Sequence, residues 1–407
     1  MAGEDSIATM LAEPVAAGEM AGAVTIVWRG EVLQTAAVGW ADVASQIPLA
    51  RDRLFRIASM SKPVTSVAAL MLLEEGALAL DEPIARRAPE FAQMRVLREV
   101  DGPLDDTVPA QRQITFEDLL THRAGITYGD FHSGPIKAAY AQALGGSIDS
   151  HVTPDEWIAG LASLPLIAQP GADFHYGAST DLLGFLIARI EGAPLGEVLA
   201  RRIFRPLGMA DTGFVVPPEK RGRRAGLHGF DAEGRLIRLA AVPGGAALAE
   251  RPDGMAYEGG GAGLWSTVDD YLAFARLFVG NGEVDGVRLL RPETVALMTT
   301  NRLSEAQRAG AKTFGMPVFA AGNGFGLGVA VTIDPATAAP IRGKGGLGTV
   351  SWPGAYGGWW QADPTDGSVM ILLQHNMVDP EGLSEGHGLA GYGAILELHA
   401  LGTALKA

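Results

Sequence analysis

The chain has no cysteine among its 407 residues. Disulfide bonds, thiol nucleophiles and thiolate metal sites are therefore excluded. Basic residues are scarce, because 32 Lys and Arg face 46 Asp and Glu and leave a formal net charge of −14. No basic stripe interrupts this acidic balance, so we expect no nucleic-acid partner. The eight histidines are scattered without the spacing of metal ligands, and we expect neither a metal site nor a cofactor.

The sequence also lacks a long apolar run. No stretch approaches about 18 uncharged apolar residues outside loops rich in Gly and Ala, so we expect no membrane span. Residues 1–6 read MAGEDS, an acidic start without a basic flank before an apolar core. This start shows no secretory signal, and the cytoplasm is the expected compartment. The oligomeric state cannot be read from the sequence.

What the chain does have is a hydrophobic fraction of 47%, enough for a substantial core, and a length compatible with two domains. The expected strands are 21–28, 31–39, 226–231, 235–239, 325–333, 357–362 and 368–374. The expected helices are 6–19, 64–75, 115–121, 154–163, 181–191, 194–204, 267–278 and 389–405. Strands near both ends with helices between them favour an α+β fold, with one antiparallel sheet assembled from the two termini.

Ser59 and Lys62 form the most informative pair of residues. They stand in a Ser-x-x-Lys pattern at the start of an apolar run that is typical of a buried helix. Positions i and i+3 of a helix are neighbours, which brings the hydroxyl and the amine together. An amine in a partly desolvated site can take the proton of the serine and activate it as a nucleophile. The alternative interpretation is a capping serine and a solvated lysine.

Two later segments carry further candidates. Tyr176 follows a turn and opens an apolar segment, a position from which a tyrosine can face a cleft and share a proton with a lysine. Residues 352–358 read WPGAYGG and precede a strand–turn–strand pattern. Around Gly354 and Ala355 a backbone N–H can approach a substrate carbonyl oxygen with little obstruction from side chains.

In order and spacing, these three motifs resemble those of the penicillin-recognising serine hydrolases: class C β-lactamases, D-alanyl-D-alanine peptidases and family VIII carboxylesterases. The resemblance covers most of the chain. It implies a β-lactamase-like fold, in which an antiparallel sheet flanked by helices faces a mainly helical lobe across the active-site cleft. We therefore expect an α/β sandwich domain from residues 1–90 and 245–407, and a mainly helical domain from residues 91–244.

The resemblance also implies acyl transfer. Ser59 would attack an ester carbonyl after losing its proton to Lys62 and Tyr176, and the proximate base stays open because such a pair titrates together. The N–H groups of Ser59 and Ala355 would form the oxyanion hole. Trp352 stands where β-lactamases carry a lysine that attracts the substrate carboxylate, as in the esterase branch. An indole has no positive charge, so we expect short-chain neutral esters as substrates.

Other assignments have open alternatives. Lys344 also reads Lys-x-Gly, but its glycine-rich surroundings are less strand-like than those of Trp352, which we prefer as the third motif. Tyr128 stands at a position similar to a cleft-lining tyrosine of the esterases, and is otherwise an ordinary loop aromatic. His375 ends an apolar strand, where it lines the cleft or is hydrogen-bonded at the strand terminus. Tyr128, Trp352, Gly354 and His375 are the predicted substrate contacts.

Three other functions remain compatible with these residues. The same site could pass its acyl group to an alcohol or amine, or hydrolyse amides or β-lactams weakly. A non-catalytic binding protein on this fold is disfavoured by the intact set of Ser59, Lys62 and Tyr176. An α/β-hydrolase is excluded, because no serine stands in a Gly-x-Ser-x-Gly pattern after a strand. The expected partner is a small-molecule ester.

Overall fold

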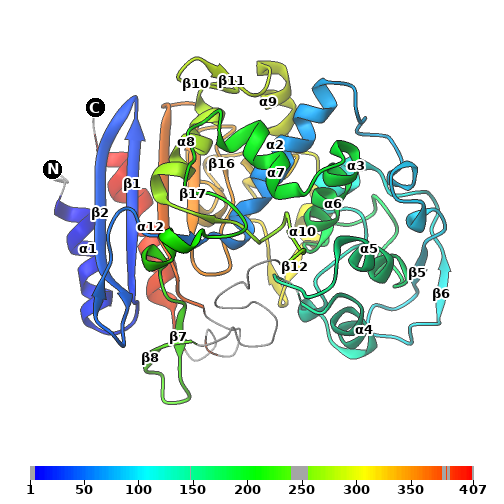
Figure 1. Ribbon diagram of the computed structural model, residues 1–407, viewed down its shortest axis with the longest axis horizontal. Coiled ribbons are helices and arrows are strands. Elements are labelled where there is room, and N and C mark those ends of the chain that lie inside the picture. Colours follow the sequence, from blue (N-terminus) through cyan, green and yellow to red (C-terminus); the bar gives the residue numbers. More distant parts are fainter. Residues whose placement is uncertain (1–4, 147, 240–254, 378–381, 383–385, 406–407) are drawn as a thin grey trace.

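An antiparallel sheet forms the centre of the computed structural model, which describes residues 5–146, 148–239, 255–377, 382 and 386–405 (Figure 1). The order of its strands is β14 (Asn323–Phe325), β15 (Ala330–Thr332), β16 (Val350–Ser351), β17 (Trp359–Asp363), β18 (Ser368–Gln374), β1 (Gly22–Arg29), β2 (Glu31–Asp42) and β3 (Ile47–Pro48). Strands β1 and β18, from opposite ends of the chain, are neighbours in this sheet. The predicted α+β class, with a sheet drawn from both termini, is confirmed.

Side chains alternate between the two faces of the sheet, as the two-residue period of a strand requires. On β1, Val24 and Ile26 belong to the main core, while Ala23 and Val27 belong to a second cluster on the other face. The helices that cover the sheet are α1 (Asp5–Ala16) and α12 (Leu389–Ala404) on the second face and α8 (Val268–Val279) on the first (Figure 1). The central strands β1, β17 and β18 are therefore buried between two helical layers, whereas β2 and β3 are partly exposed.

A mainly helical lobe lies beside this sandwich, on the right in Figure 1. Its helices are α3 (Phe116–Leu120), α4 (Gly134–Leu144), α5 (Pro154–Ala162), α6 (Ser179–Glu191) and α7 (Leu195–Leu199), which η5 (Ala200–Phe204) continues. A small hairpin in the lobe pairs β5 (Arg95–Leu97) with β6 (Thr107–Pro109). Of the predicted domain boundaries, residue 245 lies outside the described residues. Residue 90 falls within the short η3 (Pro89–Phe91), and that boundary stays a prediction.

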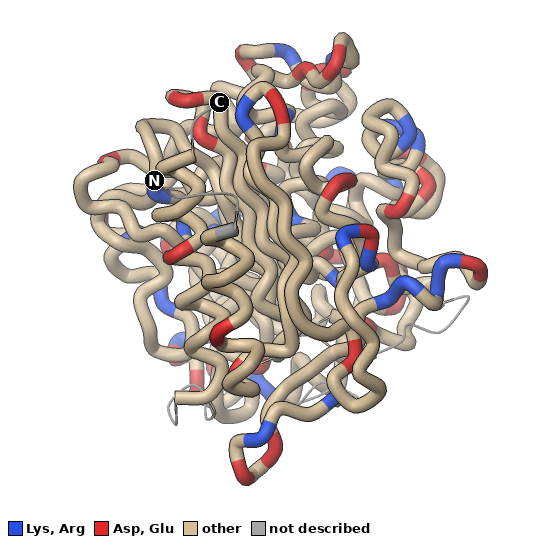
Figure 2. The backbone as a smooth tube through the Cα atoms, turned by 90° about the vertical axis from the view of Figure 1, so that its left-hand side faces the viewer, with Lys and Arg blue, Asp and Glu red and all other residues tan. Residues whose placement is uncertain are grey.

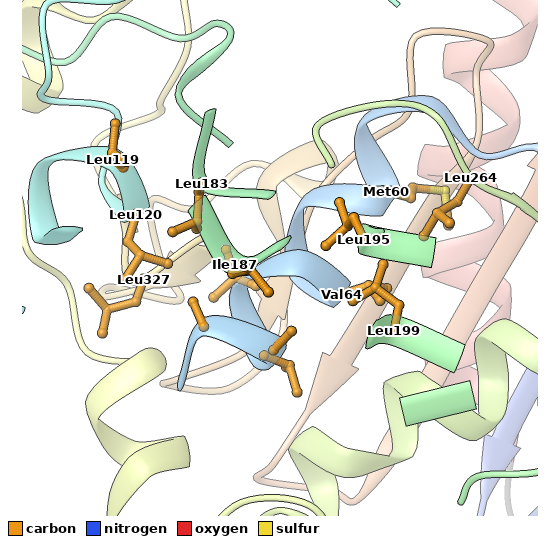
Figure 3. Packing of buried hydrophobic residues seen from close by; sticks show 14 of the residues in the cluster. Met60, Val64, Leu119, Leu120, Leu183, Ile187, Leu195, Leu199, Leu264 and Leu327 are labelled. Carbon is orange, nitrogen blue, oxygen red and sulfur yellow. The ribbon is translucent and has the colours of Figure 1, made fainter. Parts of the chain in front are cut away.

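Helix α2 (Ser61–Glu74) connects the two parts. It is apolar almost all round, which is the signature of a helix buried on every side. Figure 3 shows Val64 of α2 packed among leucine and isoleucine side chains of the helical lobe, such as Ile187 of α6 and Leu199 of α7. Because the core encloses α2, the residues at its first turn are held in fixed positions.

One predicted strand is wrong. Residues 325–333 were expected to form a single strand, but the structure has two antiparallel strands there, β14 and β15. The chain reverses between them at residues 326–329, where Gly328 adopts a φ of +91°, a conformation that L side chains rarely adopt. A glycine in a strand pattern is a signal for such a bend.

The remaining elements are short. The helical ones are α9 (Pro292–Met298), α10 (Glu305–Gly310), η1 (Ala58–Met60), η2 (Ile84–Arg86), η4 (Gly129–Phe131), η6 (Pro218–Arg223) and η7 (Pro340–Arg342). The strand pairs are β4 (Phe55–Arg56) with β9 (Trp265–Ser266), β7 (His228–Phe230) with β8 (Leu236–Arg238), β10 (Glu283–Val284) with β11 (Val287–Arg288), and β12 (Lys312–Thr313) with β13 (Met316–Pro317). The pair β4–β9 matters most for function, because it leads directly into η1 and α2.

Charged residues of both signs are interspersed around the molecule, whereas the central strands are mostly uncharged (Figure 2). Within the described residues, no helix combines the length and apolar composition that crossing a membrane requires.

Candidate active site

Ser59 lies on a strained turn between β4 and α2. The preceding residue, Ala58, is buried and has a φ of +45°, which is unusual for any residue other than glycine. Such a conformation costs about 1–3 kcal/mol and persists only where the surrounding structure enforces it. Here the backbone N–H of Ile57 donates to Leu264 O at 2.9 Å and holds the turn in place. The turn leaves Ser59 half-buried, in reach of both the interior and solvent.

Lys62 lies one helical turn beyond Ser59, and its side chain is only 1% exposed. The amine Nζ lies 3.5 Å from Ser59 Oγ, 3.0 Å from the hydroxyl of Tyr128 and 2.8 Å from Gly261 O. Three oxygen atoms thus surround a group that has three positions for hydrogen bonds. The structure therefore brings the predicted serine and lysine together, and it adds Tyr128 to them.

Tyr128 connects Lys62 to a buried carboxylate that sequence reasoning missed. The Tyr128 hydroxyl donates to Asp181 Oδ2 at 3.0 Å, and Asp181 Oδ1 accepts from the N–H of Gly261 at 2.8 Å. Burial and the nearby Asp181 raise the pKa of Tyr128 well above its usual value, so this hydroxyl keeps its proton. Burial raises the pKa of Asp181, while Lys62 and the hydrogen bonds to the carboxylate oppose that rise. The sequence feature that could have revealed Asp181 is its position in the apolar segment that begins α6, where an aspartate is unexpected.

Tyr176 is held against the loop that carries Tyr128. Thr127 Oγ1 donates to Tyr176 O at 3.3 Å, and the two tyrosine rings lie 6.0 Å apart. Gly177 permits this approach, because a Cβ there would lie 2.2 Å from the carbonyl carbon of Thr127. The Lys62 amine lies 4.7 Å from the centre of the Tyr176 ring. Both tyrosines thus border the same amine, Tyr128 through its hydroxyl and Tyr176 through its ring.

His122 supports Tyr176 from behind, and it was not among the predicted site residues. Its ring lies 4.9 Å from the Tyr176 ring and also contacts Phe174 and Phe325. Complete burial and the charge of Lys62 lower the pKa of His122 well below its usual value, so it stays neutral. Its backbone carbonyl accepts from the N–H of His175 at 2.8 Å, next to Tyr176. His122 is therefore a positioning residue for Tyr176.

Trp352 closes the other side of Tyr176. Its indole Nε1–H donates to the Tyr176 hydroxyl at 3.0 Å, and the two rings lie 5.1 Å apart. An indole N–H can only donate, so the tyrosine proton stays available for a different acceptor. Lys344, the competing residue for the third motif, is exposed, and its backbone N–H donates to Gln361 Oε1 at 3.1 Å. The geometry thus joins Trp352, the preferred choice, to the tyrosine.

The segment after Trp352 lies against the turn that carries the serine. A Cβ on Gly354 would be 2.6 Å from Ile57 O, so only glycine allows this approach. The N–H of Gly357 donates to Gly354 O at 3.0 Å and closes a turn in which Ala355 is exposed. The N–H of Ala355 donates no hydrogen bond to any of the described residues. An oxyanion hole needs backbone N–H donors, and that of Ala355 belongs to a segment packed against the turn that carries Ser59.

His375 lies in a different environment from that predicted. Nε2 of its ring accepts from the N–H of Arg56 at 3.2 Å, and Nδ1 lies 3.1 Å from Ala225 O. The side chain is 4% exposed, and burial lowers its pKa to about 3. Because backbone groups occupy both nitrogens, this position does not support the predicted contact with substrate. The alternative, a hydrogen-bonded histidine at a strand terminus, fits these contacts.

Comparison with known proteins defines the class. Residues 7–390 match the family model described as Beta-lactamase. An uncharacterized protein of Mycobacterium tuberculosis is 47% identical over 361 residues, 88% of this chain and 87% of that protein. Esterase EstB of Burkholderia gladioli is 33% identical over 379 residues, 90% of this chain and 88% of EstB. Among solved structures, EstCE1, a hydrolase with promiscuous acyltransferase activity, superposes with a TM-score of 0.76 at 27% identity, covering 96% of this chain and 97% of that chain.

The chain therefore belongs to the β-lactamase family. It has the β-lactamase-like fold, and it is a serine hydrolase of the esterase type whose homologues include esterases and acyltransferases.

The pKa of His375 leads to a prediction about acid stability. The neutral ring is required in the folded protein, whereas the unfolded chain binds a proton below a pH of about 6.5. The free energy of unfolding should therefore fall as the pH falls from about 6.5 toward 4, and His375→Asn should reduce this fall by about 1 kcal/mol or more. Urea unfolding at several pH values measures it. Equal slopes for the parent and His375→Asn would contradict the structural role, and the exposed His151→Asn serves as the control.

Proposed function

We propose that this serine hydrolase cleaves short-chain carboxylic esters through an acyl-enzyme on Ser59. One observation carries the proposal: the amine of the buried Lys62 lies 3.5 Å from Ser59 Oγ, within a site bordered by Tyr128 and Tyr176. A serine hydroxyl becomes a nucleophile only when a neighbouring group accepts its proton. Lys62 is the nitrogen base that stands next to it.

In the first step, Lys62 takes the proton from Ser59 as Oγ forms a bond to the ester carbonyl carbon. The resulting ammonium is held by Tyr128 and by Gly261 O, which compensate for its burial. Asp181 lies one hydrogen bond further away, and its carboxyl group and the charge of Lys62 act on each other. The hydrogen-bond acceptors for the positive charge that forms on Lys62 are therefore in position before the attack begins.

The developing oxyanion would be bound by the backbone N–H groups of Ser59 and Ala355. The exposed position of Ala355 supports this assignment, as does the contact of Gly354 with the turn that carries Ser59. Such donors act on charge that exists only in the transition state, and each is worth about 3 kcal/mol.

Tyr176 then returns the proton to the leaving alcohol. As the bond between the carbonyl carbon and the alcohol oxygen breaks, the proton held by Lys62 reaches that oxygen by way of Tyr176, whose ring borders the amine. Trp352 Nε1–H holds the phenol oxygen in place and leaves its proton free to move. Water repeats the sequence on the acyl-enzyme and releases the acid.

The expectation of a short acyl chain rests on Trp352, whose buried indole contacts Tyr176 and takes up space beside the proposed nucleophile.

Acyl transfer is the second candidate, and the similarity to EstCE1 favours it, since that hydrolase has promiscuous acyltransferase activity. The chemistry differs only in the acceptor, because an alcohol replaces water in the second half of the reaction. β-Lactam hydrolysis is disfavoured, since Trp352 stands where a carboxylate-binding lysine would be. The cytoplasmic location and the lack of nucleic-acid or membrane partners stay predictions from the sequence.

Replacement of the nucleophile and base tests the proposed function. Ser59→Ala and Lys62→Ala should each lower kcat/KM for p-nitrophenyl butyrate by about a thousandfold or more, since both remove groups of the covalent step. Tyr176→Phe should lose most of the rate at every pH. Initial rates on acetyl to decanoyl p-nitrophenyl esters, with benzylpenicillin alongside, measure this. Near-parental rates in Ser59→Ala, or equal efficiency on benzylpenicillin and the butyrate, would contradict the proposal.

The choice of Trp352 over Lys344 makes a second prediction. Trp352→Ala should lower kcat/KM on p-nitrophenyl esters by about tenfold, because it removes the donor to Tyr176 and apolar surface beside the reacting carbonyl. Trp352→Phe should lose the donor and retain most of the surface, giving an intermediate loss. Lys344→Ala should be nearly silent. A loss in Lys344→Ala confined to anionic esters, with Trp352→Ala at the parental rate, would place the third motif at Lys344.

A further inference from the structure

Arg342 lies on the outer face of Trp352. It ends η7 between β15 and β16, and its guanidinium carbon is 4.7 Å from the centre of the Trp352 ring. Its Nε donates to Val318 O at 3.2 Å, which fixes the planar group over the indole. The side chain is half-buried, so it combines a fixed position with access from solvent.

This guanidinium has no acidic partner among the described residues. Some other partly buried arginines are paired with an acid, for example Arg123 with Glu117 and Arg202 with Glu191. Around Arg342 the nearby ionisable groups are instead Tyr176 and Tyr392. Burial lowers the pKa of Arg342 to about 10, which leaves it cationic at neutral pH. A cation that is partly desolvated without a counter-ion is a ready site for an anionic group from outside.

The position of Arg342 indicates which part of the substrate it would contact. Tyr176 hands a proton to the leaving alcohol, and Trp352 donates to the hydroxyl of that tyrosine. The wall formed by Trp352 and Arg342 therefore borders the alcohol part of the ester.

We propose that Arg342 binds a carboxylate on the alcohol part of the substrate, so that the preferred substrates are short-chain acyl esters of hydroxycarboxylic acids. This inference rests on the proposed esterase function and specifies its substrate class. The prediction of neutral ester substrates rests on Trp352 alone, which has no charge. Arg342 supplies a positive charge from a different segment, so we expect only the acyl part of the substrate to be neutral.

A matched pair of esters tests the inference. 3-Acetoxybenzoate carries a carboxylate on its leaving phenol, and 3-acetoxybenzamide is its neutral counterpart. The parent should prefer the anionic ester, and Arg342→Met, which keeps apolar contact with Trp352, should lower the ratio of the two kcat/KM values by about tenfold through a higher KM. Arg342→Lys should retain much of the ratio, and added salt should reduce it in the parent.

Two controls separate charge recognition from a structural role. Arg308 is also half-buried and donates to Ala321 O at 2.9 Å, so Arg308→Met should leave the ratio unchanged. A carboxylate on the acyl side, in p-nitrophenyl hemiglutarate compared with p-nitrophenyl butyrate, should give a ratio that Arg342→Met does not alter.

The outcomes distinguish this inference from the function on which it rests. In one outcome, the parent hydrolyses 3-acetoxybenzamide while neither Arg342 variant changes the ratio of kcat/KM for the anionic ester to kcat/KM for the neutral one. That result would overturn the role of Arg342 but not the esterase function. An equal fall in Arg308→Met, or an effect confined to the acyl-side carboxylate, would also overturn it. No turnover of any ester by the parent would remove the esterase proposal itself.

Discussion

The burial of one amine is the constraint on which the site depends. Lys62 is almost wholly removed from water, and an amine in that position needs partners for each of its hydrogen bonds. Ser59, Tyr128 and Gly261 provide them, and they come from three distant segments of the chain. The segments must therefore be assembled before the lysine can be buried, so the local chemistry and the global fold support each other.

The arrangement of the two lobes follows from the same requirement. Helix α2 carries Lys62 at its first turn and is enclosed by both the sheet layer and the helical lobe (Figure 3). The lobe contributes Tyr128, Tyr176 and Asp181, while the sheet side contributes Trp352 and the turn after it. The residues of the proposed catalytic site thus converge from both parts on one helix end, where the strained turn at Ala58 presents Ser59.

The sequence was informative where spacing or residue type alone carries chemistry. Ser59 and Lys62 are near neighbours in the chain, so helical geometry predicts their contact, and Tyr176 and Trp352 stand in motifs that resemble a known family. Asp181, His122 and Arg342 were missed because their roles depend on contacts between distant segments: a buried carboxylate reached through Tyr128, a ring behind Tyr176 and a guanidinium over Trp352. His375 and the strand expected over 325–333 show the same limit, since apolar patterning does not report hydrogen-bond partners or chain reversals.

The central claim is that Lys62 activates Ser59 as the nucleophile, and covalent labelling tests it most directly. A p-nitrophenyl alkylphosphonate reacts with an activated serine to give a stable adduct, and peptide mass spectrometry locates that adduct. The account predicts one adduct, on Ser59, formed rapidly in the parent and at least about a hundredfold more slowly in Lys62→Ala. An adduct on another residue, or equal labelling rates in the two proteins, would contradict the account.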